Sequence, residues 1–129
     1  MKTAATIPQT VVRVAGPILI VLGLLFWTGN ALTLIPVHML LGIILVLSLW
    51  TLAVMSLLAR VSPGAAVVAL VWGLAVPVLG LTQTALLPGG LHWLVQLLHL
   101  LLGLGAIAQA ESLARRIKQH TDEVAEAAA

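Results

Sequence analysis

The chain has 129 residues, of which 61% are hydrophobic and only 8% are charged. Residues 14–59 and 61–110 contain no Asp, Glu, Lys or Arg. This composition excludes an ordinary soluble domain and indicates an integral membrane protein, with the lipid bilayer as its main partner. The net charge of +2 gives no reason to expect a nucleic-acid partner. Cysteine is absent, which excludes disulfides, thiolate metal sites and covalently attached c-type haem.

The apolar stretches predict four membrane-spanning helices. We expect them at about residues 12–27, 35–58, 65–86 and 91–115, because about 20 apolar residues cross a bilayer. Turn-forming segments separate them: Thr28-Gly29-Asn30, residues 60–64 and Pro88-Gly89-Gly90. The predicted fold is all-α, an antiparallel four-helix bundle in a single domain of residues 1–116. Residues 117–129 are expected to form a cytoplasmic tail, first a short helix extension and then disorder.

The basic residues predict the orientation of the bundle. All six Lys and Arg residues fall at one end of the predicted helices, whereas the loops near Asn30 and Pro88 carry no charge. The positive-inside rule therefore places both termini in the cytoplasm of a bacterial-type inner membrane. We expect no cleavable signal peptide, because the first apolar stretch is too long for one.

Two histidines occur in the same local motif. His38-Met-Leu-Leu-Gly42 is matched by His99-Leu-Leu-Leu-Gly103, on the second and fourth predicted helices. An imidazole in hydrocarbon is costly without a partner, and a glycine one turn later removes a side chain that would block a flat ligand. The pattern predicts that His38 and His99 bind the iron of one haem b, with Gly42 and Gly103 lining the porphyrin.

Depth along the helices does not select the partner of His38 uniquely. Measured from the outer turns, His38 and His99 lie within about one helical turn of each other. Measured from Arg60 and Arg115, His92 matches His38 better. We prefer His99, since only it has the following glycine, and keep His92 as the alternative ligand. In the preferred arrangement His92 lies roughly 10 Å further out on the same stripe. There His92 and Gln96 would contact the haem propionates.

Simpler interpretations exist for these features. A histidine in a membrane helix can bond a backbone carbonyl, and glycines can serve helix packing alone. Gly105 and the alanines near it are expected to contact another helix or a second protomer, which suggests a homodimer. Trp50 and Trp72 either pack in the bundle or flank a cofactor, and His120 is expected to be a solvated tail residue.

Acidic residues are nearly missing from the apolar region. Glu111 is the single acid within reach of a predicted span, and its spacing predicts a local ion pair with Arg115. A proton-coupled exporter would need a carboxylate within the membrane, so that class is disfavoured. Residues 80–84 form the other polar segment, which either bonds a quinone or a propionate or satisfies its own backbone.

The architecture, together with His38, Gly42, His99 and Gly103, resembles the small four-helix membrane cytochromes b, including cytochrome b561-like and ferric-reductase-like proteins. The resemblance implies one-electron transfer, with quinol, superoxide or a periplasmic redox protein as partner. Many such proteins hold two haems, whereas the inner halves of these helices contain no histidine. The competing interpretations are a cofactor-free accessory subunit of a larger membrane complex and a haem sensor or carrier.

Overall fold

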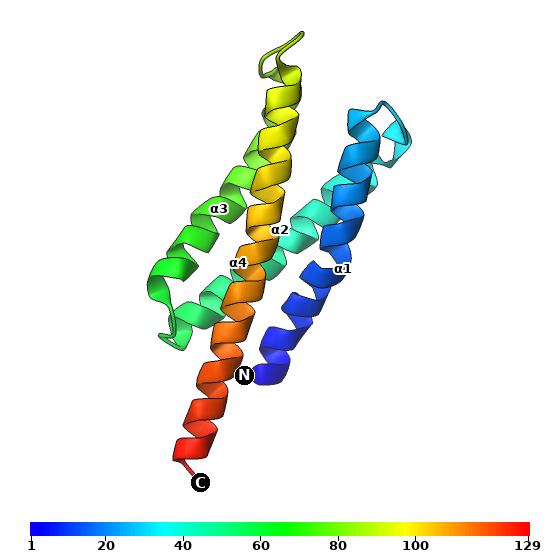
Figure 1. The fold of residues 1–129 in the computed structure, drawn as a ribbon. Coiled ribbons are helices and arrows are strands. Elements are labelled where there is room, and N and C mark those ends of the chain that lie inside the picture. Colours follow the sequence, from blue (N-terminus) through cyan, green and yellow to red (C-terminus); the bar gives the residue numbers. More distant parts are fainter.

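The computed structural model describes residues 1–129 and contains four α-helices joined by short connections. Consecutive helices run in opposite directions, so both termini lie at one end of the molecule (Figure 1). The elements are α1 (Lys2–Trp27), the short 3₁₀ helix η1 (Leu32–Leu34), α2 (Ile35–Leu58), α3 (Pro63–Thr82), the 3₁₀ helix η2 (Gln83–Ala85) and α4 (His92–Ala127). The predicted all-helical fold with four helices is confirmed.

The helix bounds differ from the expected ones mainly at the chain ends. Helix α2 matches the expected range, whereas α1 begins at Lys2 and α3 ends at Thr82, four residues before the expected end at 86. Helix α4 continues to Ala127, so the expected disorder in the tail is wrong. Residues 117–127 contain no Gly or Pro and are rich in good helix formers, which allows the helix to continue.

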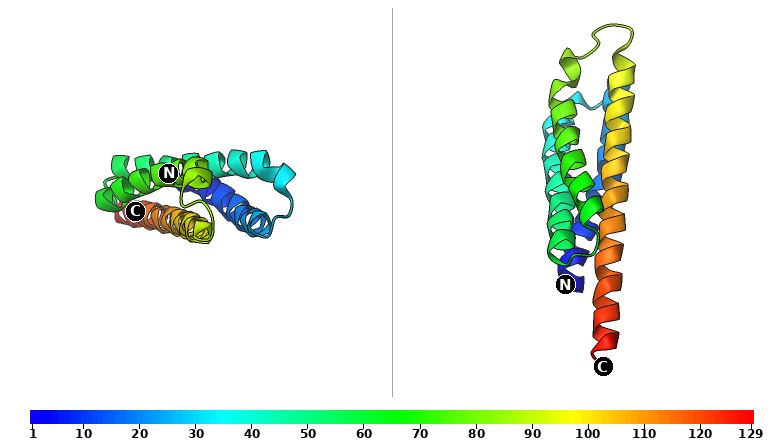
Figure 2. Two further views of the ribbon diagram at one scale, coloured as in Figure 1. Left: turned by 90° about the horizontal axis from the view of Figure 1, so that it is seen from above. Right: turned by 90° about the vertical axis from the view of Figure 1, so that its left-hand side faces the viewer.

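The four helices are not equivalent in their contacts. Helix α2 packs against α1, α3 and α4, and α4 packs against all three others, whereas α1 and α3 do not contact each other. The α1–α2 and α3–α4 hairpins therefore meet along a diagonal formed by α2 and α4 (Figure 2). A residue on the inner side of α2 consequently faces a residue of α4.

The hydrophobic core lies in the half of the bundle that holds the termini. The largest fully buried apolar side chains are all there: Val12, Leu49, Leu52, Leu113 and Ile117. In the half towards the two loops, residues 18–44 and 74–102, the buried hydrophobic residues are Leu22 and Val95. Figure 1 shows α1 and α4 diverging towards that loop end. The chain's own side chains therefore pack this half much less completely.

All four helices are long and apolar enough to cross a membrane. Large apolar side chains are exposed along every one of them, for example Val21, Leu40, Val71 and Leu101. In water such a surface would be unfavourable, whereas in lipid it faces a solvent of its own polarity. The exposed surface and the helix lengths together indicate a membrane protein.

Candidate functional site

The two motif histidines face each other across the diagonal of the bundle. The ring centroids of His38 on α2 and His99 on α4 lie 6.4 Å apart, with their planes tilted by 48°. Both residues lie in the loop half, near the start of their helices. The structure thus brings together the two residues that share the His-x-x-x-Gly motif.

Neither histidine satisfies its polar atoms within the chain. The Nδ1 atom of His38 and that of His99 are both buried without a hydrogen-bond partner. The simpler interpretation, in which each imidazole bonds a nearby backbone carbonyl, therefore does not describe these nitrogens. Buried polar atoms without a partner are rare because desolvation costs about 1–3 kcal/mol. Two of them belong to this pair of rings, and the third such atom in the chain, Oε1 of Gln109, lies ten residues after His99 on α4.

Each histidine ring packs against a glycine of the preceding helix. A Cβ built at Gly23 of α1 would lie 3.8 Å from Cε1 of His38, and one built at Gly80 of α3 would lie 3.0 Å from Cε1 of His99. Phe26 also packs against His38, edge to face, with the ring centroids 5.4 Å apart. From the sequence, Gly23 and Gly80 could be interpreted as ordinary helix-packing glycines, and nothing connected them with the histidines. The sequence did contain a pattern that could have indicated these contacts: each histidine follows a helix that carries a glycine near its loop end.

The two glycines of the repeated motif have open space beside them. A Cβ built at Gly42 or at Gly103 would meet no atom within 4 Å. These glycines therefore serve no close helix contact in this chain. Their absent side chains leave room one turn away from each histidine.

His92 and Gln96 lie further towards the loop end. His92 is the first residue of α4, and its Nδ1 lies 3.2 Å from the backbone carbonyl oxygen of Leu86. The structure therefore joins His92 to the connection before α4, whereas His99 faces His38. Gln96 is half-buried, one turn after His92 and three residues before His99.

The histidine pair fits the size of a bis-imidazole haem site. When two imidazoles bind one metal ion from opposite sides, each metal–nitrogen bond is about 2 Å long, and each ring centroid lies about half a ring width beyond its nitrogen. The two centroids are then roughly 6 Å apart. The observed 6.4 Å is of this size. The free Nδ1 atoms, the incomplete packing of the loop half and the open space at Gly42 and Gly103 agree with such a ligand. The centroid distance is therefore compatible with two imidazoles that bind one metal ion.

Two tryptophans connect successive helices away from the histidines. The indole nitrogen of Trp50 donates to the carbonyl oxygen of Leu70 at 3.1 Å, and that of Trp72 donates to the carbonyl oxygen of Leu102 at 2.8 Å. Trp50 packs on Gly73, three residues after Leu70, and Trp72 packs on Gly105, three residues after Leu102. Both indoles therefore pack within the bundle, which is one of the two roles considered from the sequence.

The small residues of α4 also pack within the chain. Besides Gly105, the side chains of Ala106, Ala110 and Ala114 are fully buried in the core. The expected homodimer depended on this small-residue surface. Because this surface packs within the chain, it no longer supports a homodimer. The homodimer stays a prediction.

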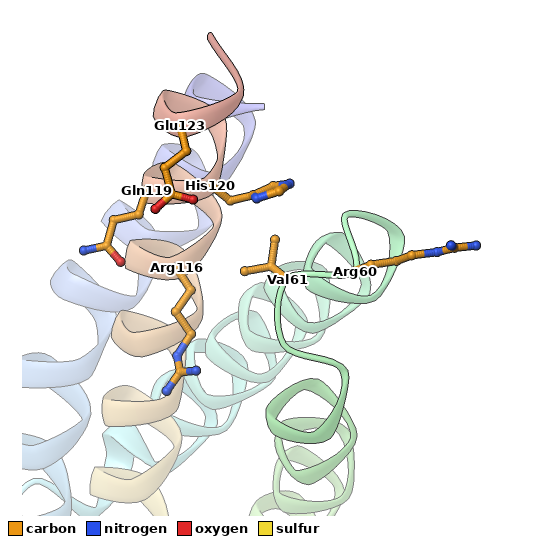
Figure 3. Close-up of a pocket in the computed structure, with 6 residues that line it drawn as sticks. All are labelled: Arg60, Val61, Arg116, Gln119, His120 and Glu123. Carbon is orange, nitrogen blue, oxygen red and sulfur yellow. The ribbon is translucent and has the colours of Figure 1, made fainter. Parts of the chain in front are cut away.

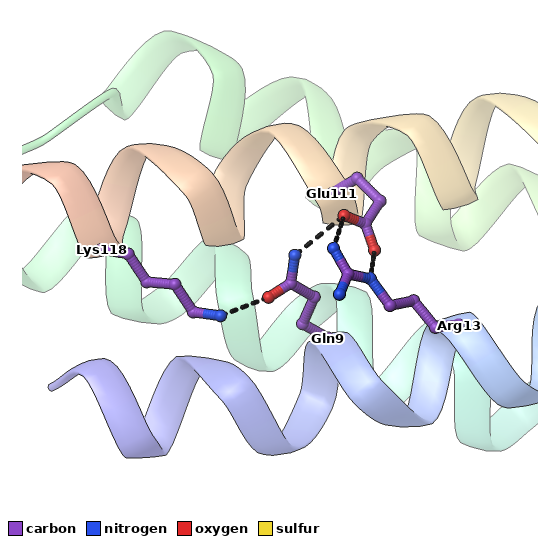
Figure 4. Close-up of polar contacts among 4 residues, drawn as sticks. All are labelled: Gln9, Arg13, Glu111 and Lys118. Carbon is purple, nitrogen blue, oxygen red and sulfur yellow. Dashed lines mark hydrogen bonds and ion pairs between the residues drawn. The ribbon is translucent and has the colours of Figure 1, made fainter.

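Glu111, the single acid near the apolar region, forms its ion pair with a residue of another helix and not with one of its own helix α4. The guanidinium of Arg13 donates to both carboxylate oxygens of Glu111, at 2.7 and 2.9 Å, and Gln9 donates to one of them at 2.8 Å (Figure 4). Lys118 donates to the side-chain oxygen of Gln9. The predicted ion pair of Glu111 with Arg115 is wrong, because α1 packs against α4 and presents Arg13 to Glu111 in a two-point geometry. This cluster fastens α1 to α4 at the terminal end.

The polar segment at the end of α3 bonds partly to its own backbone. The hydroxyl of Thr82 donates to the carbonyl oxygen of Val78 at 2.7 Å, while Gln83 lies in η2 without a side-chain hydrogen bond. No group of three or more His, Cys, Asp or Glu residues lies close enough together to hold a metal ion.

No protein-family model, curated protein or solved structure matches the chain.

Proposed function

We propose that this chain is an integral membrane cytochrome b that holds one haem between His38 and His99. The observation that carries the proposal is the facing pair of imidazoles, 6.4 Å apart on different helices, with both Nδ1 atoms buried and unpaired. Bis-histidine ligation uses one nitrogen of each ring and leaves the other protonated. The second candidate ligand, His92, is less suited because its ring already contacts Leu86.

The protein residues would each have a defined task around the group. His38 and His99 would hold the iron, and Gly42 and Gly103 would leave room beside the macrocycle. Gly23 and Gly80 would set how far each imidazole can retreat towards the neighbouring helix, since any side chain there would press on the ring. His92 and Gln96, nearer the loops, would donate hydrogen bonds to the propionates. His92 would have to leave the Leu86 carbonyl or use its other nitrogen.

A haem held by His38 and His99 would supply one-electron transfer and would disfavour oxygen binding. The proposed orientation follows from charge: all six basic residues lie in the half of the bundle that holds the termini, with Arg13 near the middle of α1. This end is therefore cytoplasmic, and the histidine pair lies near the outer face. The electron partner is then a quinol in the bilayer, superoxide or a periplasmic redox protein. The membrane is a bacterial-type inner membrane.

The decisive experiment is an absorption spectrum of the purified full chain from a haem-supplemented membrane expression, oxidised and after reduction with dithionite. We expect a sharp low-spin b-type spectrum with one haem per chain. A protein that shows no Soret band even after haem is added would overturn the proposal and favour a cofactor-free accessory subunit. Weak, substoichiometric binding would instead indicate a haem carrier or sensor.

A further inference from the structure

The two helices that contain no histidine, α1 and α3, each carry a proline in their interior. These prolines are Pro17 in α1, which also has Pro8 nearer its N-terminus, and Pro77 in α3. Helices α2 and α4, which carry His38 and His99, have no proline in their interior. Proline has no backbone N–H, so the carbonyl oxygen four residues earlier receives no helical hydrogen bond. Helices α1 and α3 can therefore bend at these points.

Each of the two prolines separates a packed part of its helix from a loosely packed part. All buried residues of α3 precede Pro77: Ala66, Ala69 and Gly73. In α1, six of the seven buried residues precede Pro17, and Leu22 is the exception. We call residues 18–27 of α1 and residues 78–82 of α3 the loop parts of these helices. Because segments with few buried contacts open at a low cost in free energy, the loop parts can move while the rest of the bundle stays folded.

Helix α1 is fastened to α4 directly before Pro17. Arg13 forms its ion pair with Glu111, and a Cβ built at Gly16 would lie 2.8 Å from Cδ1 of Ile107. Both contacts lie on the terminal side of the proline. Bending at Pro17 would therefore move the loop part of α1 and leave the preceding part in place.

Helix α3 is fastened in a similar way before Pro77. Arg116 of α4 donates to the hydroxyl of Ser62, the residue before α3, at 3.3 Å. Figure 3 shows the turn before α3, with Val61, beside Arg116 and His120 of α4. His120, expected to be solvated, is half-buried there. Further along, the indole nitrogen of Trp50 donates to a backbone carbonyl oxygen of α3 at 3.1 Å.

The loop parts are the segments that touch the two site histidines. The backbone at Gly23 packs on the ring of His38, and the backbone at Gly80 packs on the ring of His99. A flat ligand that enters between rings whose centroids are 6.4 Å apart must displace at least one ring for a time. Movement of either ring is limited by the loop part that it touches. Entry of the ligand therefore requires a loop part to give way.

We propose that Pro17 and Pro77 are hinges at which the loop parts of α1 and α3 bend away from His38 and His99, and so admit a flat ligand between the imidazoles. The loop parts then close against the rings and hold them at the ligand. That this ligand is haem rests on the proposed function, whereas the bending can be measured without any ligand.

The bending of α1 is tested by pulsed electron paramagnetic resonance on the detergent-purified full chain without haem. Nitroxide labels on Leu24→Cys and Leu101→Cys report the distance between the loop part of α1 and α4, since both side chains are exposed and the chain has no native cysteine. We expect a broad distance distribution that Pro17→Ala narrows to a single peak, because alanine restores the missing N–H. Pro8→Ala is the matched control: it makes the same change in the fastened part of α1 and should leave the distribution broad.

The bending of α3 is tested in the same way. Labels on Leu81→Cys and Leu40→Cys, both exposed, report the distance between the loop part of α3 and α2. Pro77→Ala should narrow this distribution, whereas Pro17→Ala should leave it unchanged because that proline belongs to the other hairpin.

The admission of the ligand is tested by the rate at which haem binds to the apoprotein, followed by stopped-flow absorption. Pro17→Ala and Pro77→Ala should each slow both binding and release about tenfold, the factor that corresponds to one restored backbone hydrogen bond. The final low-spin spectrum should be unchanged, because neither proline contacts the histidines. Pro8→Ala should keep the wild-type rates.

The outcomes separate the hinges from the proposed function. A single narrow distribution in the wild-type chain, or equal narrowing by Pro8→Ala and Pro17→Ala, would overturn the hinge at Pro17. Wild-type rates of haem binding in both Pro17→Ala and Pro77→Ala would show that bending does not admit the ligand, and would overturn the proposal while the cytochrome stands. Absence of haem binding in every variant would overturn the proposed function, and the distance distributions would still decide whether the hinges exist.

Discussion

The imidazoles of His38 and His99 lie with their centroids 6.4 Å apart, although they come from different hairpins of the bundle. This pairing depends on the diagonal contact between α2 and α4, since neither histidine could reach the other along its own hairpin. A ligand held between them would therefore join the two hairpins in the half where their own packing is least complete.

The first prediction concerns the ligands. His38→Ala and His99→Ala should each abolish the low-spin spectrum, because either change leaves one axial position of the iron empty. His92→Ala should keep the low-spin bands and change only the midpoint potential or the haem affinity. The measurement is the reduced-minus-oxidised difference spectrum of each purified variant. Loss of the bands in His92→Ala together with their retention in His99→Ala would assign ligation to His92 instead.

The second prediction concerns the space beside the histidines. Gly42→Leu should lower haem affinity about tenfold or more, since overfilling a packed site costs roughly 1–3 kcal/mol. The fold itself should tolerate the change, because no atom lies within 4 Å of the position. Haem titration of the apoprotein measures the effect. Gly64→Leu is the matched control: it also has open space, but it lies at the start of α3, at the opposite end from the histidines.

Unchanged haem affinity in Gly42→Leu would show that this glycine faces lipid and does not line the cofactor. The same variant should keep its helix content in circular dichroism. A loss of helix content would mean that the position is packed more tightly than its open surroundings indicate.

The third prediction compares two glycines of α4 that differ in their neighbours. A Cβ at Gly105 would lie 2.6 Å from Cζ2 of Trp72, whereas one at Gly103 would meet nothing. Gly105→Ala should therefore lower the free energy of unfolding by about 1–3 kcal/mol. Gly103→Ala should be neutral or stabilising by up to about 1 kcal/mol, because alanine is the better helix former. Thermal unfolding in detergent without haem checks both values.

A stabilising effect of Gly105→Ala would contradict the close contact between Trp72 and α4. Trp72→Phe offers a second readout of the same contact. It removes the donor to the Leu102 carbonyl and should cost about 0.5–1.5 kcal/mol.

Sequence patterns predicted the number of helices, the bounds of α2 and the pairing of His38 with His99. Each of these depends on local composition or on repeated spacing. The patterns could not reveal contacts between distant segments. Glu111 was matched with Arg115 by i,i+4 spacing, but the packing of α1 against α4 places Arg13 against it. Likewise, the glycines behind His38 and His99 belong to other helices, so only packing in three dimensions connects them.

The fourth prediction concerns that ion pair. Glu111→Gln and Arg13→Gln should each lower the thermal unfolding temperature, and the double variant should lose less than the sum, because both single changes break the same two-point contact. Arg115→Gln should change the unfolding temperature little, since Arg115 makes no ion pair. Strict additivity of Glu111→Gln and Arg13→Gln would show that the pair contributes nothing to stability. Stronger coupling of Glu111 to Arg115 would restore the local pair expected from the sequence.

The fifth prediction concerns topology, which the absence of native cysteine makes easy to test. Single variants Asn30→Cys and Gly90→Cys lie in the two loops of the histidine end, and Ala128→Cys lies at the end of α4. A membrane-impermeant maleimide added to intact spheroplasts should label the two loop variants and label Ala128→Cys only after the membrane is opened. The positive-inside rule requires this result because every basic residue lies at the Ala128 end. The opposite labelling would place the histidine pair near the cytoplasm, and its electron partner would then have to be sought there.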